Sequence, residues 1–87
     1  MRSVAAVFFP GGFGTLDELF ELLTLCQTGM KTKIPIILFG REYWNKIINF
    51  EYLADLGLIE DEHLNLFQYA DTASEAWEII KSSKISA

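Results

Sequence analysis

The stretch SVAAVFFPGGFGTLDE, residues 3–18, decides the fold of this 87-residue chain. Its first part, residues 3–9, is a continuous apolar run that predicts a strand buried on both faces. The run stops at a turn signal, PGG, at residues 10–12. Good helix formers follow over residues 14–30, GTLDELFELLTLCQTGM, and Gly29 is placed to end that helix.

Two more pairs of strand and helix follow. Residues 34–39, IPIILF, predict a second buried strand. Apolar positions at helical spacing predict a helix over residues 41–56, with Gly57 at its end. Residues 66–70, LFQYA, predict a short third strand, and TASE at residues 72–75 is a capping box that predicts the start of a last helix.

The three alternations predict an α/β fold with a parallel sheet of right-handed β-α-β units. Without a reversal of strand order, the helices would lie on one face of the sheet. The other face of three apolar strands would then be bare, and the edge at the first strand would be open. We therefore interpret residues 1–87 as one domain that is half of a doubly wound fold.

Composition excludes several classes of protein. Hydrophobic residues make up 51% and aromatic residues 14% of the chain, which is too much for a disordered one. The net charge of −5 would repel a nucleic-acid polymer. The single cysteine forms no internal disulfide or cysteine-rich metal site and indicates a reducing cytoplasm. The N-terminal residues 1–9 do not have the pattern expected of a signal peptide, and no apolar run approaches the ~20 residues that span a membrane.

The turn PGGFGT, residues 10–15, is the first candidate site. It follows a predicted strand at its carboxyl end, where open α/β sheets bind ligands. Gly11, Gly12 and Gly14 would let the backbone approach a ligand closely. The helix N-terminus adds unpaired N–H groups and Thr15 adds a hydroxyl, which together suit a phosphate monoester. The alternative is a tight turn in which the glycines serve packing only, since the pattern is neither a GxGxxG nor a Walker A motif.

The helix after this turn has a wide apolar face. At about 100° per residue, its apolar side chains cover an arc of about 220°, more than an ordinary surface helix shows. We therefore expect it to be covered by its own sheet and also by a second copy, in a homodimer through residues 15–29. The arc consists of Leu16, Leu19, Phe20, Leu22, Leu23, Leu25, Cys26 and Met30.

Glu18 is the second candidate, because it falls within this arc while Asp17 and Glu21 lie on the polar face. A carboxylate in an apolar rim, one turn from a candidate phosphate site, is interpreted as a group at the edge of a pocket. The alternative is an acid of the first turn that complements the helix dipole. Gln27 also lies in the arc, where we expect a structural role such as a hydrogen bond across an interface.

Other conspicuous residues are expected to be structural. Cys26 is interpreted as a small core residue rather than a nucleophile. His63 follows three acids, cannot hold a metal alone and is expected in a solvated loop. Trp44 and Trp77 lie on apolar helix faces and are expected in the core. Arg41 is expected on a solvated surface.

Residues 10–18, PGGFGTLDE, match the signature PGGxGTxxE and resemble the LONELY GUY type of cytokinin-activating phosphoribohydrolases, a family long described as "possible lysine decarboxylase". The later stretches ELLTLCQTGM, IPIILFG and REYW are similar to its longer bacterial members. The resemblance implies a three-layer Rossmann-like fold, in which this chain is the C-terminal half with the order β-α-β-α-β-α. It also implies a dimer.

The same resemblance implies hydrolysis of the N-glycosidic bond of a nucleoside 5′-monophosphate, AMP or a cytokinin riboside monophosphate, to free base and ribose 5-phosphate. It implies that Gly11, Gly12 and Gly14 hold the phosphate. Thr15 would join them, and Glu18 would be the catalytic carboxylate. No metal and no organic cofactor is implied.

Full-length members of that family carry an N-terminal half with its own nucleotide-binding glycines and a catalytic arginine. We therefore expect this chain to need an N-terminal half for activity. The alternative is a catalytically silent nucleotide-binding or dimerisation module of the same fold. A pyridoxal-phosphate decarboxylase is not favoured, because every lysine lies in a polar context.

Overall fold

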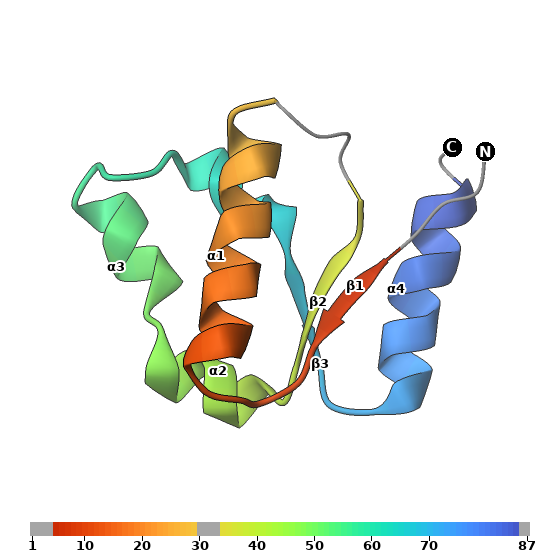
Figure 1. Cartoon of the computed structure of the whole chain (residues 1–87). Coiled ribbons are helices and arrows are strands. Elements are labelled where there is room, and N and C mark those ends of the chain that lie inside the picture. Colours follow the sequence, from red (N-terminus) through yellow and green to blue (C-terminus); the bar gives the residue numbers. More distant parts are fainter. Residues whose placement is uncertain (1–4, 30–33, 86–87) are drawn as a thin grey trace.

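The structure, a computed structural model, describes residues 5–29 and 34–85. These residues form an α/β fold around a three-stranded parallel sheet with the order β1-β2-β3 (Figure 1), so the predicted fold class is confirmed. The elements in chain order are β1 (Ala6–Phe8), α1 (Phe13–Gln27), β2 (Ile36–Phe39), α2 (Arg41–Ile47), α3 (Phe50–Asp55), the 3-10 helix η1 (Asp61–Leu66), β3 (Gln68–Ala70) and α4 (Ala73–Ile85).

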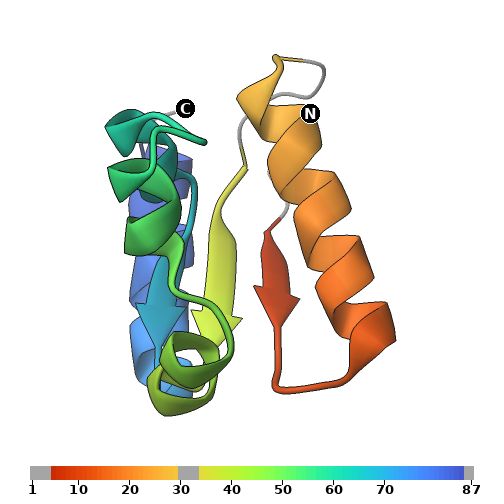
Figure 2. The same ribbon diagram turned by 90° about the vertical axis from the view of Figure 1, so that its left-hand side faces the viewer.

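Helices cover both faces of the sheet. The two crossovers place α1, α2 and α3 on one face, as right-handed connections between neighbouring parallel strands require (Figure 1). The last helix, α4, packs against β3 from the opposite face (Figure 2). The prediction of one shared face is therefore wrong for α4. This helix follows the last strand and connects to no further strand in the described residues, so the crossover rule does not fix its side.

The strand β2 lies in the middle of the sheet and is buried on both faces. Ile36, Ile37 and Leu38 are at most 1% exposed. The edge strand β1 differs, because Val7 is 36% exposed and Phe9, just after the strand, is 59% exposed. The prediction of burial on both faces is thus right for β2 and wrong for β1, since α4 lies over β3 rather than over β1.

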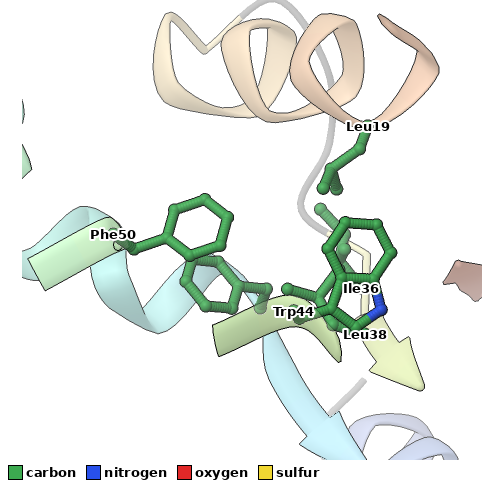
Figure 3. Close-up of a cluster of buried hydrophobic side chains, with 6 residues drawn as sticks. Leu19, Ile36, Leu38, Trp44 and Phe50 are labelled. Atoms are coloured by element: carbon green, nitrogen blue, oxygen red, sulfur yellow. The ribbon is translucent and has the colours of Figure 1, made fainter. Parts of the chain in front are cut away.

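The main core lies between the sheet and the helices α1 to α3 (Figure 3). Trp44 is fully buried there, and its indole N–H donates a hydrogen bond to the Phe39 carbonyl at 3.0 Å. The predicted core position of Trp44 is confirmed. That of Trp77 is wrong, because this α4 side chain is 52% exposed. The buried cluster consists of Leu19, Ile36, Leu38, Trp44, Phe50 and Phe67.

The predicted helix over residues 41–56 is in fact two helices. The break comes at Ile48, whose backbone is extended, with φ −133° and ψ 127°. Asn49 then caps α3, because its side-chain oxygen accepts the Tyr52 N–H at 3.0 Å. Asparagine at such a position favours a new helix start over continuation of the old helix. Gly57, with φ 79°, ends α3 as predicted.

The helix α1 begins at Phe13 and ends at Gln27. Asp17 and Glu18 therefore lie beyond its first turn, which overturns the alternative that Glu18 is a first-turn acid. Gly29 has φ 77° and follows the helix end as predicted.

One side of α1 packs on the core, and Phe20 stays partly exposed, with its ring centre 6.5 Å from that of the core residue Phe50. Leu19 is fully buried, whereas Phe20 is 41% exposed. Met30 lies outside the described residues. The side chains that pack against the buried cluster are Leu16, Leu22, Leu23 and Cys26, so the structural role expected of Cys26 agrees with its position.

The segment that holds His63 is a 3-10 helix rather than the solvated loop that we predicted. The half-buried His63 ring accepts the Glu60 N–H at Nδ1, at 3.0 Å, and thereby caps η1. The same Nδ1 lies 3.2 Å from Nε2 of Gln27. Gln27 thus bonds within the chain, where we had expected a bond across an interface.

We predict that Trp44→Phe lowers the free energy of unfolding by about 1–3 kcal/mol, because it leaves the Phe39 carbonyl without its donor and opens a cavity. Urea unfolding followed by far-ultraviolet circular dichroism measures this loss. Trp77→Phe is the matched control and should change the value by less than about 0.5 kcal/mol, because that ring is half exposed. Equal losses in the two variants would contradict the assignment of Trp44 to the core.

Candidate functional site

The carboxyl ends of all three strands meet at one edge of the sheet (Figure 1). The chain leaves β1 into the glycine turn, residues 10–15, and leaves β2 at Gly40 and β3 at Asp71. The Gly40 N–H donates to the Ala70 carbonyl at 2.8 Å, so a hydrogen bond joins the end of β2 to the end of β3. Ligands of open parallel sheets bind at this edge.

The three glycines of the turn differ in what surrounds them. A Cβ atom on Gly11 would clash with Oγ1 of Thr15, so packing alone requires glycine there. A Cβ atom on Gly12 or Gly14 would meet nothing within 4 Å. Close packing therefore accounts for Gly11 but not for Gly12 or Gly14. Gly12 is the N-cap of α1, a position that favours glycine, whereas Gly14 lies within α1, where glycine is unfavourable.

The N-terminus of α1 begins within this turn. Gly12 is the N-cap, and no side chain caps the helix. The first helical hydrogen bond runs from the Leu16 N–H to the Gly12 carbonyl at 3.1 Å, so the N–H groups before Leu16 have no partner within the helix. Such groups, together with the helix dipole and the Thr15 hydroxyl, are suited to an anion.

Glu18 lies on α1 four residues after Gly14, and residues at this spacing share one face of a helix. Its side chain is exposed, and within the described ranges no cation pairs with it. The structure thus brings the predicted phosphate-binding residues into one turn and sets Glu18 one helical turn beyond Gly14. The carboxylate is free to meet a ligand held at the helix N-terminus.

The connection from β2 to α2 supports the glycine turn, and sequence reasoning missed this support. The Tyr43 hydroxyl donates a hydrogen bond to the Gly11 carbonyl. Gly40 has φ 97°, and a Cβ atom there would lie 3.3 Å from Cγ of Pro10. Tyr43 and Gly11 are 32 residues apart, so no local spacing signalled the contact.

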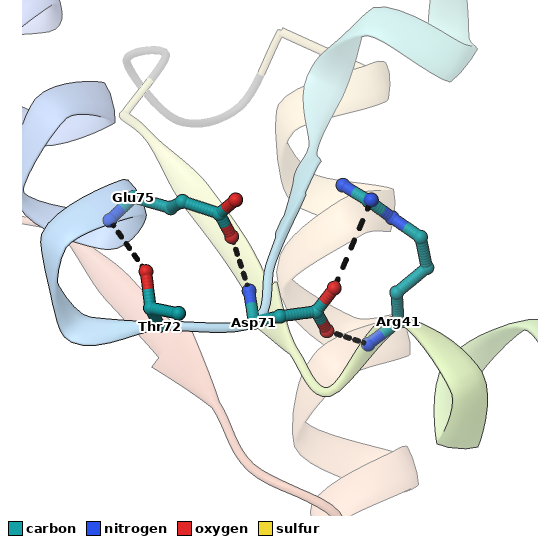
Figure 4. A network of polar contacts seen from close by, with 4 residues as sticks. All are labelled: Arg41, Asp71, Thr72 and Glu75. Carbon is teal, nitrogen blue, oxygen red and sulfur yellow. Dashed lines mark hydrogen bonds and ion pairs between the residues drawn. The ribbon is translucent and has the colours of Figure 1, made fainter.

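A polar network ties the start of α2 to the end of β3 (Figure 4). The Arg41 backbone N–H donates to Oδ1 of Asp71 at 2.7 Å, and the Arg41 guanidinium lies 3.8 Å from Oδ2 of the same carboxylate. Arg41 is therefore half exposed, as expected of a surface residue, and is paired with Asp71.

The same network contains the predicted capping box. Thr72 accepts the Glu75 N–H at 3.1 Å, as predicted. The Glu75 carboxylate accepts the Asp71 N–H at 2.6 Å, one residue before the cap, instead of the N–H of the cap itself. The start of α4 thus also fixes the backbone of Asp71.

A depression of about 500 Å³ lies beside α2 and β3. Tyr69 lines it together with Arg41 and Glu51, and the Arg41 guanidinium lies 5.7 Å from the centre of the Tyr69 ring. Burial raises the pKa of the Tyr69 hydroxyl above its ordinary value of 10.0. The Glu51 carboxylate raises it further, and Arg41 opposes both effects.

Residues 5–29 and 34–85 contain neither a metal-binding cluster nor a membrane-spanning helix. No group of three or more His, Cys, Asp or Glu side chains gathers there in a way that would hold a metal ion. None of the helices in this part of the chain has the length and hydrophobicity that a membrane crossing demands.

The family model and the individual relatives that match this chain point to the same family of proteins. The family model described as "Possible lysine decarboxylase" matches residues 1–80. The chain is 33% identical to "Probable cytokinin riboside 5′-monophosphate phosphoribohydrolase LOG4" of Oryza sativa subsp. japonica over 72 residues, 82% of this chain and 31% of the relative. It is 34% identical to "Cytokinin riboside 5′-monophosphate phosphoribohydrolase LOG3" of Arabidopsis thaliana over 75 residues, 85% of this chain and 35% of the relative. The chain thus spans about a third of the length of these curated relatives.

Alanine substitutions in the turn should have opposite effects on stability. Gly14→Ala should raise the free energy of unfolding by up to about 1 kcal/mol, because the methyl group enters open space and alanine favours the helix. Gly11→Ala should lower it by roughly 1–3 kcal/mol, because its Cβ meets Oγ1 of Thr15. Urea unfolding of both variants measures the difference. Destabilisation by both would favour the packing alternative for Gly14 as well as for Gly11.

The raised pKa of Tyr69 predicts a loss of stability at alkaline pH. A neutral hydroxyl favoured by the fold contributes stability that is fully present below the unfolded pKa of about 10 and is lost as the pH rises through the folded pKa. Tyr69→Phe should therefore flatten the fall in unfolding free energy above about pH 10, whereas Tyr52→Phe serves as the control. If the unfolding free energies of Tyr69→Phe and the wild type fell equally with pH above about pH 10, Tyr69 would not be the source of the loss of stability.

Proposed function

Because this chain belongs to the family described as "possible lysine decarboxylase", we propose that it forms the phosphate-binding and catalytic part of an enzyme that hydrolyses nucleoside 5′-monophosphates. The bond cleaved is the N-glycosidic bond, and the products are free base and ribose 5-phosphate. The observation that carries the proposal is the open space at Gly12 and Gly14, at a helix N-terminus that no side chain caps. The names of the relatives, phosphoribohydrolases of cytokinin riboside 5′-monophosphate, support the substrate class.

In this proposal the phosphate binds at the N-terminus of α1. Backbone N–H groups of the first turn and the Thr15 hydroxyl donate to its oxygens. Gly12 and Gly14 leave space for it, while Gly11 lets Thr15 pack close to the turn. Holding the phosphate positions the sugar and supplies binding energy away from the carbon that reacts.

Glu18 acts on the ribose. As the bond to the base breaks, positive charge develops on the sugar ring, and a nearby carboxylate stabilises it. The same carboxylate orients the attacking water, whose oxygen bonds to the anomeric carbon. The base leaves with the electron pair of the broken C–N bond, and the proton that the attacking water loses ends on the base, so that the products are the neutral base and ribose 5-phosphate. Glu18 suits this role because it lies on the face of α1 that carries Gly14.

We further propose that other chains or segments complete the site. The exposed apolar surface at Val7 and Phe9 is suited to an N-terminal half, and this chain spans only about a third of the length of the relatives. The exposed apolar side of α1 around Phe20 is suited to a second copy of the chain. The single cysteine, Cys26, supports a reducing cytoplasm as the location.

The activity is tested with the chain mixed with a separately expressed N-terminal half of a family member, by measuring free adenine released from AMP. Glu18→Gln should lower the rate at least about a hundredfold while the affinity for ribose 5-phosphate stays unchanged. Glu21→Gln is the matched control, because this exposed carboxylate lies on the same helix. Unchanged turnover in Glu18→Gln would rule out its catalytic role.

Persistent absence of adenine release, with ribose 5-phosphate still bound, would instead identify the chain as a catalytically silent nucleotide-binding module. Loss of ribose 5-phosphate binding in Gly14→Ala distinguishes binding at the turn from binding elsewhere. That variant is suited to the test because its methyl group meets no protein atom within 4 Å.

A further inference from the structure

The peptide group between Gly11 and Gly12 is held by a side chain from another element. The Tyr43 hydroxyl of α2 donates to the Gly11 carbonyl. Within the described residues, the N–H group of Gly12, at the other end of this peptide group, has no hydrogen-bond acceptor. The two ends of one peptide unit are therefore in different states, one bonded and one available.

The bond at one end fixes the direction of the other. No described peptide bond is cis, and a trans peptide directs its carbonyl and its N–H to opposite sides. Once Tyr43 holds the Gly11 carbonyl, the Gly12 N–H is directed away from Tyr43. Glycines on both sides of this peptide offer little steric resistance to rotation of its plane, so the hydroxyl supplies a restraint that the local sequence lacks.

The donor itself is held firmly in place. The Tyr43 ring packs edge-on against Trp44, with ring centres 4.9 Å apart, and Trp44 is fully buried. The start of α2 is tied to β3 through the Arg41 backbone N–H and Asp71 (Figure 4). The position of the Tyr43 hydroxyl is thus set by the core and by the neighbouring strand, independently of the glycine turn.

We propose that Tyr43 is a positioning residue that orients the Gly12 N–H for a phosphate oxygen. The inference rests on the proposed function, because it concerns the same phosphate site. Tyr43 acts through the Gly11 carbonyl and does not itself touch the ligand. The recognised group is the phosphate monoester, so Tyr43 affects binding of ribose 5-phosphate and of inorganic phosphate alike.

Tyr43→Phe tests this role in the full chain, because it removes only the hydroxyl and keeps the ring against Trp44. The amide resonance of Gly12 should shift in the free variant. The dissociation constants for ribose 5-phosphate and inorganic phosphate should rise by about threefold to tenfold, the effect of one hydrogen bond. In the assembled enzyme, KM for AMP should rise by the same factor while kcat stays constant. Tyr52→Phe, which alters an exposed tyrosine on α3, should change none of these.

The outcomes separate this inference from the proposed function. If the wild type binds neither ligand, the proposed function fails. If the wild type binds and Tyr43→Phe binds equally well, or if its Gly12 resonance does not move, the positioning role fails. A measurement on the wild type alone adds a check that does not depend on folding of the variant. Saturating ribose 5-phosphate should slow hydrogen exchange of the Gly12 amide, and an unchanged rate would overturn the inference.

Discussion

The burial of β2 on both faces is the constraint on which the rest of the structure depends. Ile36 and Leu38 face the core formed with α1 and Trp44, and Ile37 is buried as well. A central strand of this kind needs a parallel neighbour on each side and helices over both faces. The two crossovers supply the helices on one face of the sheet, and α4 supplies part of the layer on the other face. The burial of β2 therefore accounts for the position of each helix.

This arrangement also explains why the candidate site lies where it does. Parallel pairing brings the ends of β1, β2 and β3 to the same edge of the sheet. The residues that follow the strands, which are far apart in sequence, then bond to one another. Asp71 after β3 holds the start of α2, and Tyr43 of α2 holds Gly11 after β1. The geometry of the glycine turn is therefore a property of the whole edge rather than of the turn alone.

Sequence reasoning succeeded where the determining interactions are local. Apolar runs and glycines located the three strands, and Gly29 and Gly57 marked helix ends correctly. It failed where a competing local interaction or a distant partner decides the outcome. Asn49 divides one predicted helix into two because its side chain caps the second.

The errors caused by distant partners concern residues whose surroundings are formed by other helices and strands. His63 looked solvated beside three acids, but it caps η1 and contacts Gln27 from α1. Trp77 looked like a core residue, but it is 52% exposed on α4, which packs mainly against β3. Among the site residues, the sequence correctly predicted that the glycines lie in the turn after β1 and that Glu18 lies on the helix that follows it. The support from Tyr43 did not, because it needs the tertiary fold.

The composition of the turn has a consequence for how the chain can vary. Phe13 lies between the two open glycines and is 93% exposed, so its side chain contributes almost nothing to the packing of the turn. A ligand site made of main-chain N–H groups keeps its chemistry whatever side chain stands at such a position. It also responds only to the charge and shape of a phosphate, which every nucleotide shares. In the proposed function, preference among bases therefore arises at the far end of the ligand, and changes that alter the choice of substrate leave the phosphate site intact.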